Sequence, residues 1–348
     1  MGRRWRAVLG WMVVAGVVAG LLGASGPGAA QARLRPLVIV MPTTPPNLIH
    51  IPPWVAMDAG IFARYGLQAR ILTVESGVAA MRTLVGSHGE VHIAAPGVPP
   101  FVALVAHGGD VKAVATYAMR HPVAMVVQPG IRSCQDLRGK KLGTPGGMGA
   151  YVEVMIRAVL QSCGLTPRDV QYINITTAAR VSAMVTGQID GTAAHLDQVY
   201  ELIRQKPGLR VLANLADLLP KGWYAAYVVT GDLVRSDPTL VRDAVMALVE
   251  ANRYIYQHRQ QTIDIAVKYT KEDRDALARA YDDYVRRGMW PVNEGLHRDL
   301  VEEGLDTEVR VGNIPAGEKP TYEQVVDISF LRAAMTKLGR WTGDPRWY

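Results

Sequence analysis

The sequence predicts an α/β fold of two similar lobes that are joined by two strands. Three observations predict it. The chain has 348 residues and is 49% hydrophobic, which is enough for two domains with buried cores. Strand and helix patterns alternate along most of its length, which indicates parallel sheets flanked by helices. The chain also resembles itself when it is shifted by 98 positions.

Three short segments carry this internal repeat. The pairs that align at the offset of 98 are Gly66–Leu67 with Gly164–Leu165, Gly89–Val91 with Gly187–Ile189, and Val111–Ala115 with Leu209–Ala213. Two copies with so long a period are too few for a solenoid. They indicate a pair of similar lobes.

Each copy alternates strands with helices. In the first copy we expect strands over 37–41, 69–74, 91–95 and 112–117, with helices over 53–62, 78–85 and 100–106. In the second copy we expect strands over 141–143, 170–175, 189–193 and 210–213, with helices over 150–162, 179–186 and 197–205. The apolar side chains of Val152, Met155, Ile156 and Val159 form one stripe, as in a helix that lies on a sheet.

Two extended segments, 123–128 and 224–230, lie between and after the copies and are expected to carry the chain between lobes. Asp237 and Pro238 then begin a helix as N-cap and first helical residue. The rest is helical to about Gly339, interrupted near 312–320, and is expected to pack on the first lobe. The predicted divisions are 33–122 for the first part of lobe 1, 123–224 for lobe 2, and 225–348 for the return to lobe 1.

The first 32 residues have the features of a signal peptide. Three arginines precede an apolar stretch from Ala7 to Gly23, and Ala30-Gln31-Ala32 fits a cleavage site. A retained membrane anchor is the alternative, because no charged residue lies between Arg6 and Arg33. We expect a cleaved segment and a periplasmic protein.

Charge and cysteine content narrow the possible functions. Without the three arginines of the signal segment, 35 Lys and Arg stand against 31 Asp and Glu. This small excess, with no basic stripe and no Cys/His finger, argues against nucleic-acid binding. An exported chain can keep a disulfide, and Cys134 and Cys163 are the two cysteines available.

A loop with four glycines, Gly143, Gly146, Gly147 and Gly149, joins a short strand to the long helix of the second copy. It lacks the lysine position of a P-loop and the spacing of a dinucleotide fingerprint. Such a strand-to-helix turn can present backbone N–H groups to an anion. It can also be a plain turn that needs glycine dihedral angles.

Three segments, taken in order, resemble solute-binding proteins of the nitrate/sulfonate/taurine group. Residues 53–67, PWVAMDAGIFARYGL, fit P-x-x-A-x-x-x-G-x-F-x-x-x-G-L, residues 130–143 fit I-x-S-x-x-D-L-x-G-K-K-[IL]-G, and residues 187–191 fit G-[EQ]-[IV]-D-[AG]. Such proteins serve ABC importers and share a fold with thiamine-pyrimidine biosynthesis proteins. The likeness runs from about residue 36 to 340. It implies a type II periplasmic-binding-protein fold that closes on a small solute and docks on a permease.

Strand positions and resemblance together place the ligand among loops that follow strands in both lobes. The expected ligand-binding residues are Thr44, Asn47, Ser76, Gly77, Pro96 and Gly97 in the first lobe, Gly146, Gly147, Met148, Thr177 and His195 in the second, and Trp223 and Tyr224 where the chain returns. The glycine-rich loop is then interpreted as a helix N-terminus that faces an oxyanion.

Several of these side chains have two interpretations. His195 would donate a hydrogen bond to an anion or simply pack, and Trp223 with Tyr224 would wall an aromatic solute or pack at the hinge. Glu75 would bind an ammonium group and favour a zwitterion such as taurine, or it would simply be an exposed loop residue. His50 and Arg120-His121 lie near inferred strand ends. These histidines have no ligand spacing, so no metal is expected.

The predicted function is that of the solute-binding component of an ABC importer for a small organic anion: a sulfonate, taurine, nitrate or a carboxylate. A neutral aromatic solute or a thiamine-pyrimidine precursor is the alternative ligand. An exported ligand sensor and a pyrimidine-synthase-like enzyme are the alternative classes. The enzyme would need a first-lobe lysine and a cysteine-rich cluster, whereas the first lysine is Lys112. We expect no catalysis and no cofactor, a monomer, and a permease in the inner membrane as partner.

Overall fold

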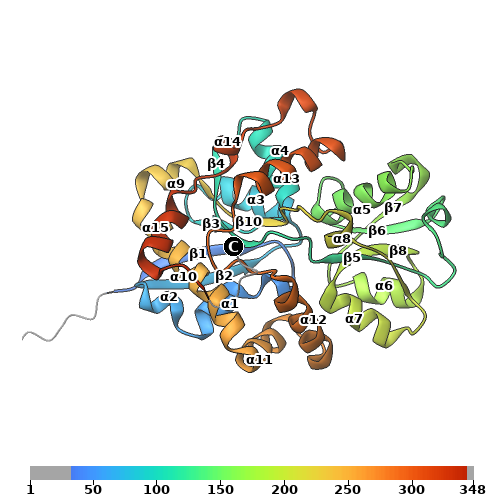
Figure 1. The fold of residues 1–348 in the computed structure, drawn as a ribbon, viewed down its shortest axis with the longest axis horizontal. Helices are drawn as coiled ribbons and strands as arrows, with labels where there is room; N and C mark the ends of the chain where they lie inside the picture. The colour runs from blue at the N-terminus through green and yellow to red at the C-terminus, as the bar shows by residue number, and fades with distance from the viewer. Residues whose placement is uncertain (1–32, 343–348) are drawn as a thin grey trace, which may run out of the picture. The chain divides into compact units, whose positions relative to one another are not determined.

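Two five-stranded sheets form the centre of the fold and lie side by side in Figure 1. The computed structural model describes residues 33–342. The first sheet contains β1 (Arg35–Met41), β2 (Leu67–Thr73), β3 (Ile93–Ala94), β4 (Val111–Ala118) and β10 (Ala225–Thr230). The second contains β5 (Val123–Val127), β6 (Lys141–Pro145), β7 (Gln171–Ile175), β8 (Gly191–His195) and β9 (Arg210–Asn214).

The two sheets have the same topology. Their strand orders are β2-β1-β3-β10-β4 and β7-β6-β8-β5-β9. In both, the strand in fourth position is antiparallel to its neighbours: β10 pairs with β3 and β4, and β5 pairs with β8 and β9. The internal repeat is therefore present in the fold, and the predicted α/β class with two similar halves is confirmed.

Helices lie between successive strands, as βα units require. Those of the first half are η1 (Leu48–His50), α1 (Pro52–Asp58), α2 (Ile61–Arg64), α3 (Gly77–Gly86) and α4 (Val98–Ala106). Those of the second half are η2 (Cys134–Leu137), α5 (Tyr151–Ser162), η3 (Pro167–Asp169), α6 (Arg180–Thr186), α7 (Leu196–Gln205) and α8 (Leu215–Leu218).

The two segments that were expected to connect the halves do not cross between them. Strand β5 lies wholly in the second sheet and β10 wholly in the first. The chain therefore passes between the halves at 119–122 and again near Gly222–Tyr224. These two runs are apolar and therefore tend to be buried. A buried backbone needs hydrogen-bond partners for its amide groups, and pairing with a strand on each side provides them.

The remaining helices are α9 (Gly231–Ser236), α10 (Pro238–Gln257), α11 (Arg259–Thr270), α12 (Arg274–Arg287), α13 (Arg298–Arg310), η4 (Ala316–Glu318), α14 (Tyr322–Val325) and α15 (Ser329–Leu338). Helix α10 contacts α1, α2 and β4 of the first half. Helix α12 also contacts α7, so the C-terminal region touches both halves.

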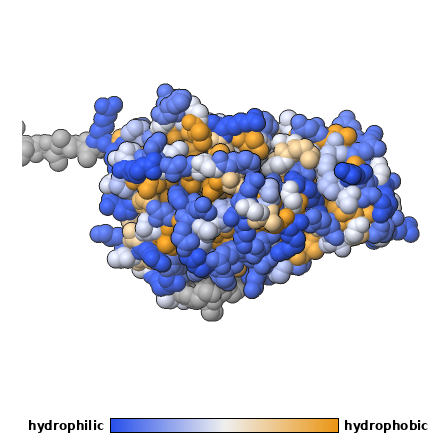
Figure 2. Space-filling view, turned by 90° about the horizontal axis from the view of Figure 1, so that it is seen from above, coloured by the Kyte–Doolittle hydropathy of each residue, from blue (hydrophilic) through white to orange (hydrophobic). Residues whose placement is uncertain are grey.

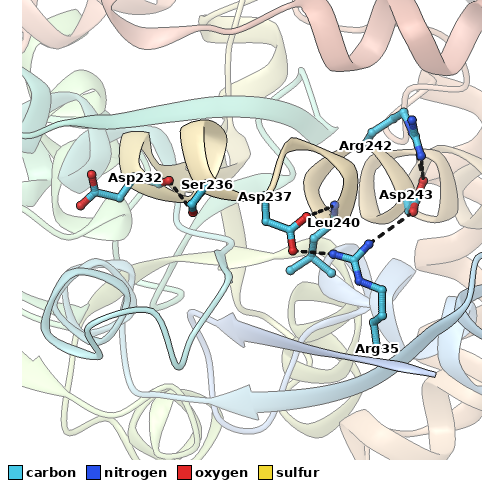
Figure 3. A network of polar contacts seen from close by, with 7 residues as sticks. All are labelled: Arg35, Asp232, Ser236, Asp237, Leu240, Arg242 and Asp243. Atoms are coloured by element: carbon cyan, nitrogen blue, oxygen red, sulfur yellow. Dashed lines mark hydrogen bonds and ion pairs between the residues drawn. The ribbon is translucent and has the colours of Figure 1, made fainter. Parts of the chain in front are cut away.

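The start of α10 is anchored to the first strand (Figure 3). Asp237 is the N-cap, and its Oδ1 accepts a hydrogen bond of 3.0 Å from the amide of Leu240. Its Oδ2 lies 2.5 Å from a guanidinium nitrogen of Arg35 on β1. The predicted Asp-Pro helix start is thereby observed, and its carboxylate also ties α10 to the sheet.

The surface is mainly hydrophilic, with separate hydrophobic patches on the face seen in Figure 2. Large apolar side chains that remain exposed among the described residues are Leu34, Val85, Met148, Ile203 and Val211. Cys134 and Cys163 form a disulfide with a Cα–Cα distance of 5.5 Å. No helix within 33–342 has the length and apolar character to cross a membrane. The predicted signal segment lies outside the described residues.

Candidate ligand-binding site

A cavity of about 40 Å³ lies where the carboxyl ends of parallel strands from both sheets meet. The residues that line it follow or end β1, β2, β3, β6, β7 and β8, which is where open α/β sheets bind ligands. They are Pro42, Thr43, Glu75, Ser76, Gly77 and Gly97 from the first half, Pro145, Ala150, Tyr151, Val152, Thr177, Arg180 and His195 from the second, and Tyr224.

Two helix N-termini point their positive ends at this cavity. Ser76 caps α3, and its hydroxyl oxygen accepts from the amide of Ala79 at 3.2 Å. Helix α5 has no side-chain cap, and its first two residues, Tyr151 and Val152, line the cavity. Uncapped N–H groups at a helix start favour a negatively charged ligand.

Arg180, the first residue of α6, brings a positive charge to the cavity. It is 1% exposed, and its Nη1 donates to Gln198 Oε1 at 2.8 Å. Its Nε finds no hydrogen-bond partner among the described residues. Burial lowers the pKa of Arg180 to about 10, while the charge of Asp197 opposes that shift. The group is therefore still cationic at neutral pH, and an anion in the cavity would compensate its charge.

Tyr224 lies between two buried histidines that come from different halves. Its hydroxyl is 2.9 Å from His195 Nε2 at the end of β8 and 2.9 Å from His50 Nε2 in η1. Burial lowers the pKa of His50 to about 3 and that of His195 well below its usual value. Both rings are therefore neutral at physiological pH.

A second tyrosine, Tyr151, lines the cavity beside Tyr224. The rings of Tyr151 and Tyr224 meet edge to face, with centroids 4.6 Å apart. The Tyr151 hydroxyl lies 2.9 Å from Nδ1 of His121, whose pKa burial lowers to about 4. The wall is thus aromatic and carries no charge of its own.

Two buried carboxyl groups lie just behind the lining. Oδ2 of Asp197 accepts from the amide of Leu48 at 2.6 Å. Glu272 is held by Nδ2 of Asn47 at 3.4 Å. Burial raises the pKa of both acids, and for Glu272 the neighbouring Asp197 charge raises it further. The raised pKa values favour the neutral forms of both acids, which limits the negative charge beside the cavity.

The cavity brings together only part of the predicted site. The predicted residues that line it are Ser76, Gly77, Gly97, Thr177, His195 and Tyr224. The predicted residues that lie outside the lining are Thr44, Asn47, Pro96, Gly146, Gly147, Met148 and Trp223. Trp223 packs on Phe101 and donates to the carbonyl of Ala225, while Met148 is 65% exposed.

Two amides of the glycine-rich loop are bonded within the protein. The amide of Gly147 donates to the carbonyl of Thr144 at 3.0 Å. That of Gly149 donates to Glu153 Oε2 at 3.0 Å. The Gly149 amide is thus bonded to a buried Glu side chain, and the first residues of α5, Tyr151 and Val152, line the cavity.

The expected ligand-binding residues did not include Thr43, Tyr151 or Arg180, although Thr43 and Tyr151 belong to the loops after strands in which the ligand was expected. Arg180 follows Thr177 by three residues, and it is the charged residue of α6, whose other residues are apolar apart from Ser182 and Thr186. An arginine in that place usually lies on the surface, which is why the pattern did not single it out.

Comparisons with known proteins agree with this architecture. The NMT1/THI5-like family model matches residues 47–262. A protein of Brucella abortus (strain 2308) named as a binding protein is 26% identical over 224 residues, covering 64% of this chain and 68% of the relative. The riboflavin-binding protein RibY of Chloroflexus aurantiacus is 25% identical over 250 residues, covering 70% of this chain and 69% of that protein.

Solved structures extend the likeness to most of the chain. The periplasmic nitrate-binding protein NrtA from Synechocystis PCC 6803 has a TM-score of 0.71 at 15% identity, covering 87% of this chain and 89% of that one. The periplasmic aliphatic sulphonate binding protein SsuA from Escherichia coli has a TM-score of 0.65 at 20% identity, covering 84% and 92%. The chain therefore belongs to the NMT1/THI5-like family and has the two-lobed fold of periplasmic binding proteins.

Proposed function

We propose that this protein is the extracytoplasmic solute-binding component of an ABC importer and that its solute is a small anion. The observation that carries the proposal is Arg180, a buried cation with an unpaired Nε, beside the uncapped start of α5. Sulfonate, nitrate and carboxylate groups all present oxygen acceptors to such donors. The names of the nitrate-binding and sulphonate-binding neighbours support the same class.

The mechanism is binding coupled to closure, without bond making. Residues 33–122 and 225–342 form one lobe in this proposal, and residues 123–224 form the other. Because the lining comes from both lobes, a ligand that contacts both stabilises the closed arrangement. A cavity of about 40 Å³ holds only a few non-hydrogen atoms, so larger solutes require the lobes to separate.

The partner follows from the same role. A permease in the inner membrane would recognise the closed lobes, and the protein would act in the periplasm as a monomer. The basic and apolar pattern of residues 1–32 supports export, and the names of the relatives as binding proteins support the receptor role.

A neutral aromatic solute is the second candidate. The riboflavin-binding relative and the Tyr151–Tyr224 wall favour it. Ring stacking would then replace charge pairing as the main source of affinity. Such a ligand would not depend on Arg180.

A thermal-shift screen tests the two candidates. The panel contains nitrate, methanesulfonate, taurine, benzoate, riboflavin and the pyrimidine precursor of thiamine. A ligand at 100 times its dissociation constant adds about 2.7 kcal/mol to stability. We expect stabilisation by one or more of the anions. Stabilisation by riboflavin or the pyrimidine alone would contradict the anion proposal.

Substitution of the arginine makes the test specific. Arg180→Gln should weaken anion binding roughly 10- to 100-fold, because it removes a charge-assisted donor from a buried site. Arg204→Gln is the matched control, since Arg204 is largely exposed and pairs with Glu201 on α7, away from the cavity lining. Calorimetric titration of both variants, after their unliganded melting temperatures are compared, separates loss of binding from loss of folding.

A further inference from the structure

Five polar groups form a continuous row beside the cavity. Nη1 of Arg180 lies 3.5 Å from His195 Nδ1, and His195 Nε2 lies 2.9 Å from the Tyr224 hydroxyl. The same hydroxyl lies 2.9 Å from His50 Nε2, and His50 Nδ1 lies 3.4 Å from Thr43 Oγ1. The row starts in one lobe, crosses to the other at Tyr224, and ends at a hydroxyl that lines the cavity.

The first member sets the direction of every bond in the row. A guanidinium group can only donate, so the Nδ1 atom of His195 must accept. A neutral imidazole carries one proton, which then lies on Nε2 of His195 and is donated to the Tyr224 oxygen. The Tyr224 proton is left for the Nε2 atom of His50.

The same argument fixes the direction of the last bond, between His50 and Thr43. Since His50 accepts at Nε2, its own proton lies on Nδ1 and is donated to Thr43 Oγ1. The Thr43 hydroxyl then accepts inside the protein and has its proton free to donate outward. Thr43 is 8% exposed and lies in the cavity lining.

We propose that this row is one directed hydrogen-bond chain, which makes the Thr43 hydroxyl a fixed donor to the bound ligand and so selects for hydrogen-bond acceptors. The inference rests on the proposed function for the ligand's place, and it adds His50, which does not line the cavity. In this chain His50 is a positioning residue. Its ring and that of His195 hold opposite tautomers.

Tyr117 is the neighbouring group that could break this order. Its ring packs edge to face on Tyr224, with centroids 5.9 Å apart. However, its hydroxyl already donates to the carbonyl of Ala95 at 2.9 Å. In the alternative arrangement, Tyr224 would donate its proton to the Tyr117 oxygen. His50 would then have to carry its own proton on Nε2, so the two arrangements differ in the tautomer of His50.

Nitrogen NMR of the unliganded protein tests the tautomers directly. The chain has eight histidines, and their ring nitrogens are assigned by the loss of signals in single variants. Long-range ¹H–¹⁵N correlation at pH 7 should show His195 protonated on Nε2 and His50 protonated on Nδ1. Nε2 protonation of both rings, or a doubly protonated ring, would overturn the chain.

Side-chain amides provide matched variants for the affinity measurement. The amide nitrogen of Asn can replace an Nδ1–H donor, and that of Gln can replace an Nε2–H donor. His195→Gln and His50→Asn should therefore bind methanesulfonate or nitrate within about threefold of the wild type. His195→Asn and His50→Gln should each lose about tenfold, which corresponds to about 1.4 kcal/mol. Equal losses within each pair would contradict the direction of the chain.

The two measurements separate this inference from the proposed function. If the wild type binds neither anion, the proposed function has failed. The NMR measurement of the tautomers still tests the directed hydrogen-bond chain, because it is made on the unliganded protein. If anions bind but the tautomers are the same in both rings, only the inference fails. Tyr224→Phe should change both histidine signals together, since it removes the one hydroxyl that joins the two rings.

Discussion

Gly146 of the second lobe lies directly against Ser76 of the first, so that a Cβ atom on the glycine would come 2.6 Å from the serine Cβ. Ser76 caps α3 at the edge of the cavity. The missing side chain therefore permits the two lobes to approach each other here. Gly146 has φ +84°, a left-handed conformation in which any other residue is strained.

Gly146→Ala should lower stability and also weaken anion binding by about tenfold, because the added methyl group pushes Ser76 away in the closed arrangement. Gly149→Ala is the matched control: its φ is +74°, and its added Cβ would meet nothing within 4 Å. Both variants should lose about 1 kcal/mol of unfolding free energy from backbone strain. Equal ligand affinities in the two variants would show that the Gly146–Ser76 contact does not limit closure.

Glu75→Gln distinguishes a simple anion from a zwitterion. Glu75 lines the same cavity as Arg180, so its carboxylate repels an anion and attracts an ammonium group. The variant should bind methanesulfonate more tightly than the wild type. It should bind taurine more weakly if the amine contacts Glu75, and calorimetry with the two sulfonates gives both values. Unchanged affinities for both would place the carboxylate away from the ligand.

Replacing both Cys134 and Cys163 by Ser should lower the unfolding free energy by about 3 to 4 kcal/mol, since the disulfide closes a loop with a sequence separation of 29. Neither cysteine lies in the cavity lining, so ligand affinity should not change. Urea unfolding of the wild type with and without reductant checks the first statement. Identical curves would mean that the bond contributes nothing to stability.

Glu308 predicts a pH dependence that can be isolated by one substitution. Burial raises the pKa of Glu308 to about 8, so the folded protein holds this carboxyl protonated well above the unfolded value near 4.5. The contribution of Glu308 to the unfolding free energy is fully present below pH 4.5. It falls by about 1.4 kcal/mol per pH unit as the pH rises from there towards 8.

Glu308→Gln keeps an acceptor for the amide of Asn313 but cannot ionise. The variant should therefore gain stability relative to the wild type between pH 5 and pH 8, as measured by urea unfolding at three pH values. Glu302→Gln, on the same helix but partly exposed beside Arg298, is the control for the Glu-to-Gln substitution itself. A stability difference for Glu308→Gln that stays constant from pH 5 to pH 8 would contradict a raised pKa.

Much of the fold could be predicted because its elements depend on local patterns. The apolar stripe of α5 and the short apolar run of β1 are visible in the sequence and lie where they were expected. Strand ends were less certain. The strand expected to end at residue 193 continues as β8 to His195, because Val123 pairs with His195 across the sheet, and that pairing involves a distant segment.

The site was predicted less completely because its chemistry depends on three-dimensional partners. Gly146, Gly147 and Gly149 do adopt left-handed dihedrals, but the amide of Gly149 donates to Glu153. A Glu at the third helical position often reaches back in this way, so the sequence did contain a signal for this bond. Arg180 had no comparable signal. Its burial results from Gln198 and His195, which come from the next strand and helix.

The position of β10 has a consequence for how the chain can fold as it emerges from a ribosome or a translocation channel. In its sheet, β4 is an edge strand whose one strand neighbour is β10. Residues 111–118 must therefore wait for residues 225–230 before they can pair, and by then every strand of the second sheet has already appeared. The lobe that is made first is therefore the lobe that is completed last.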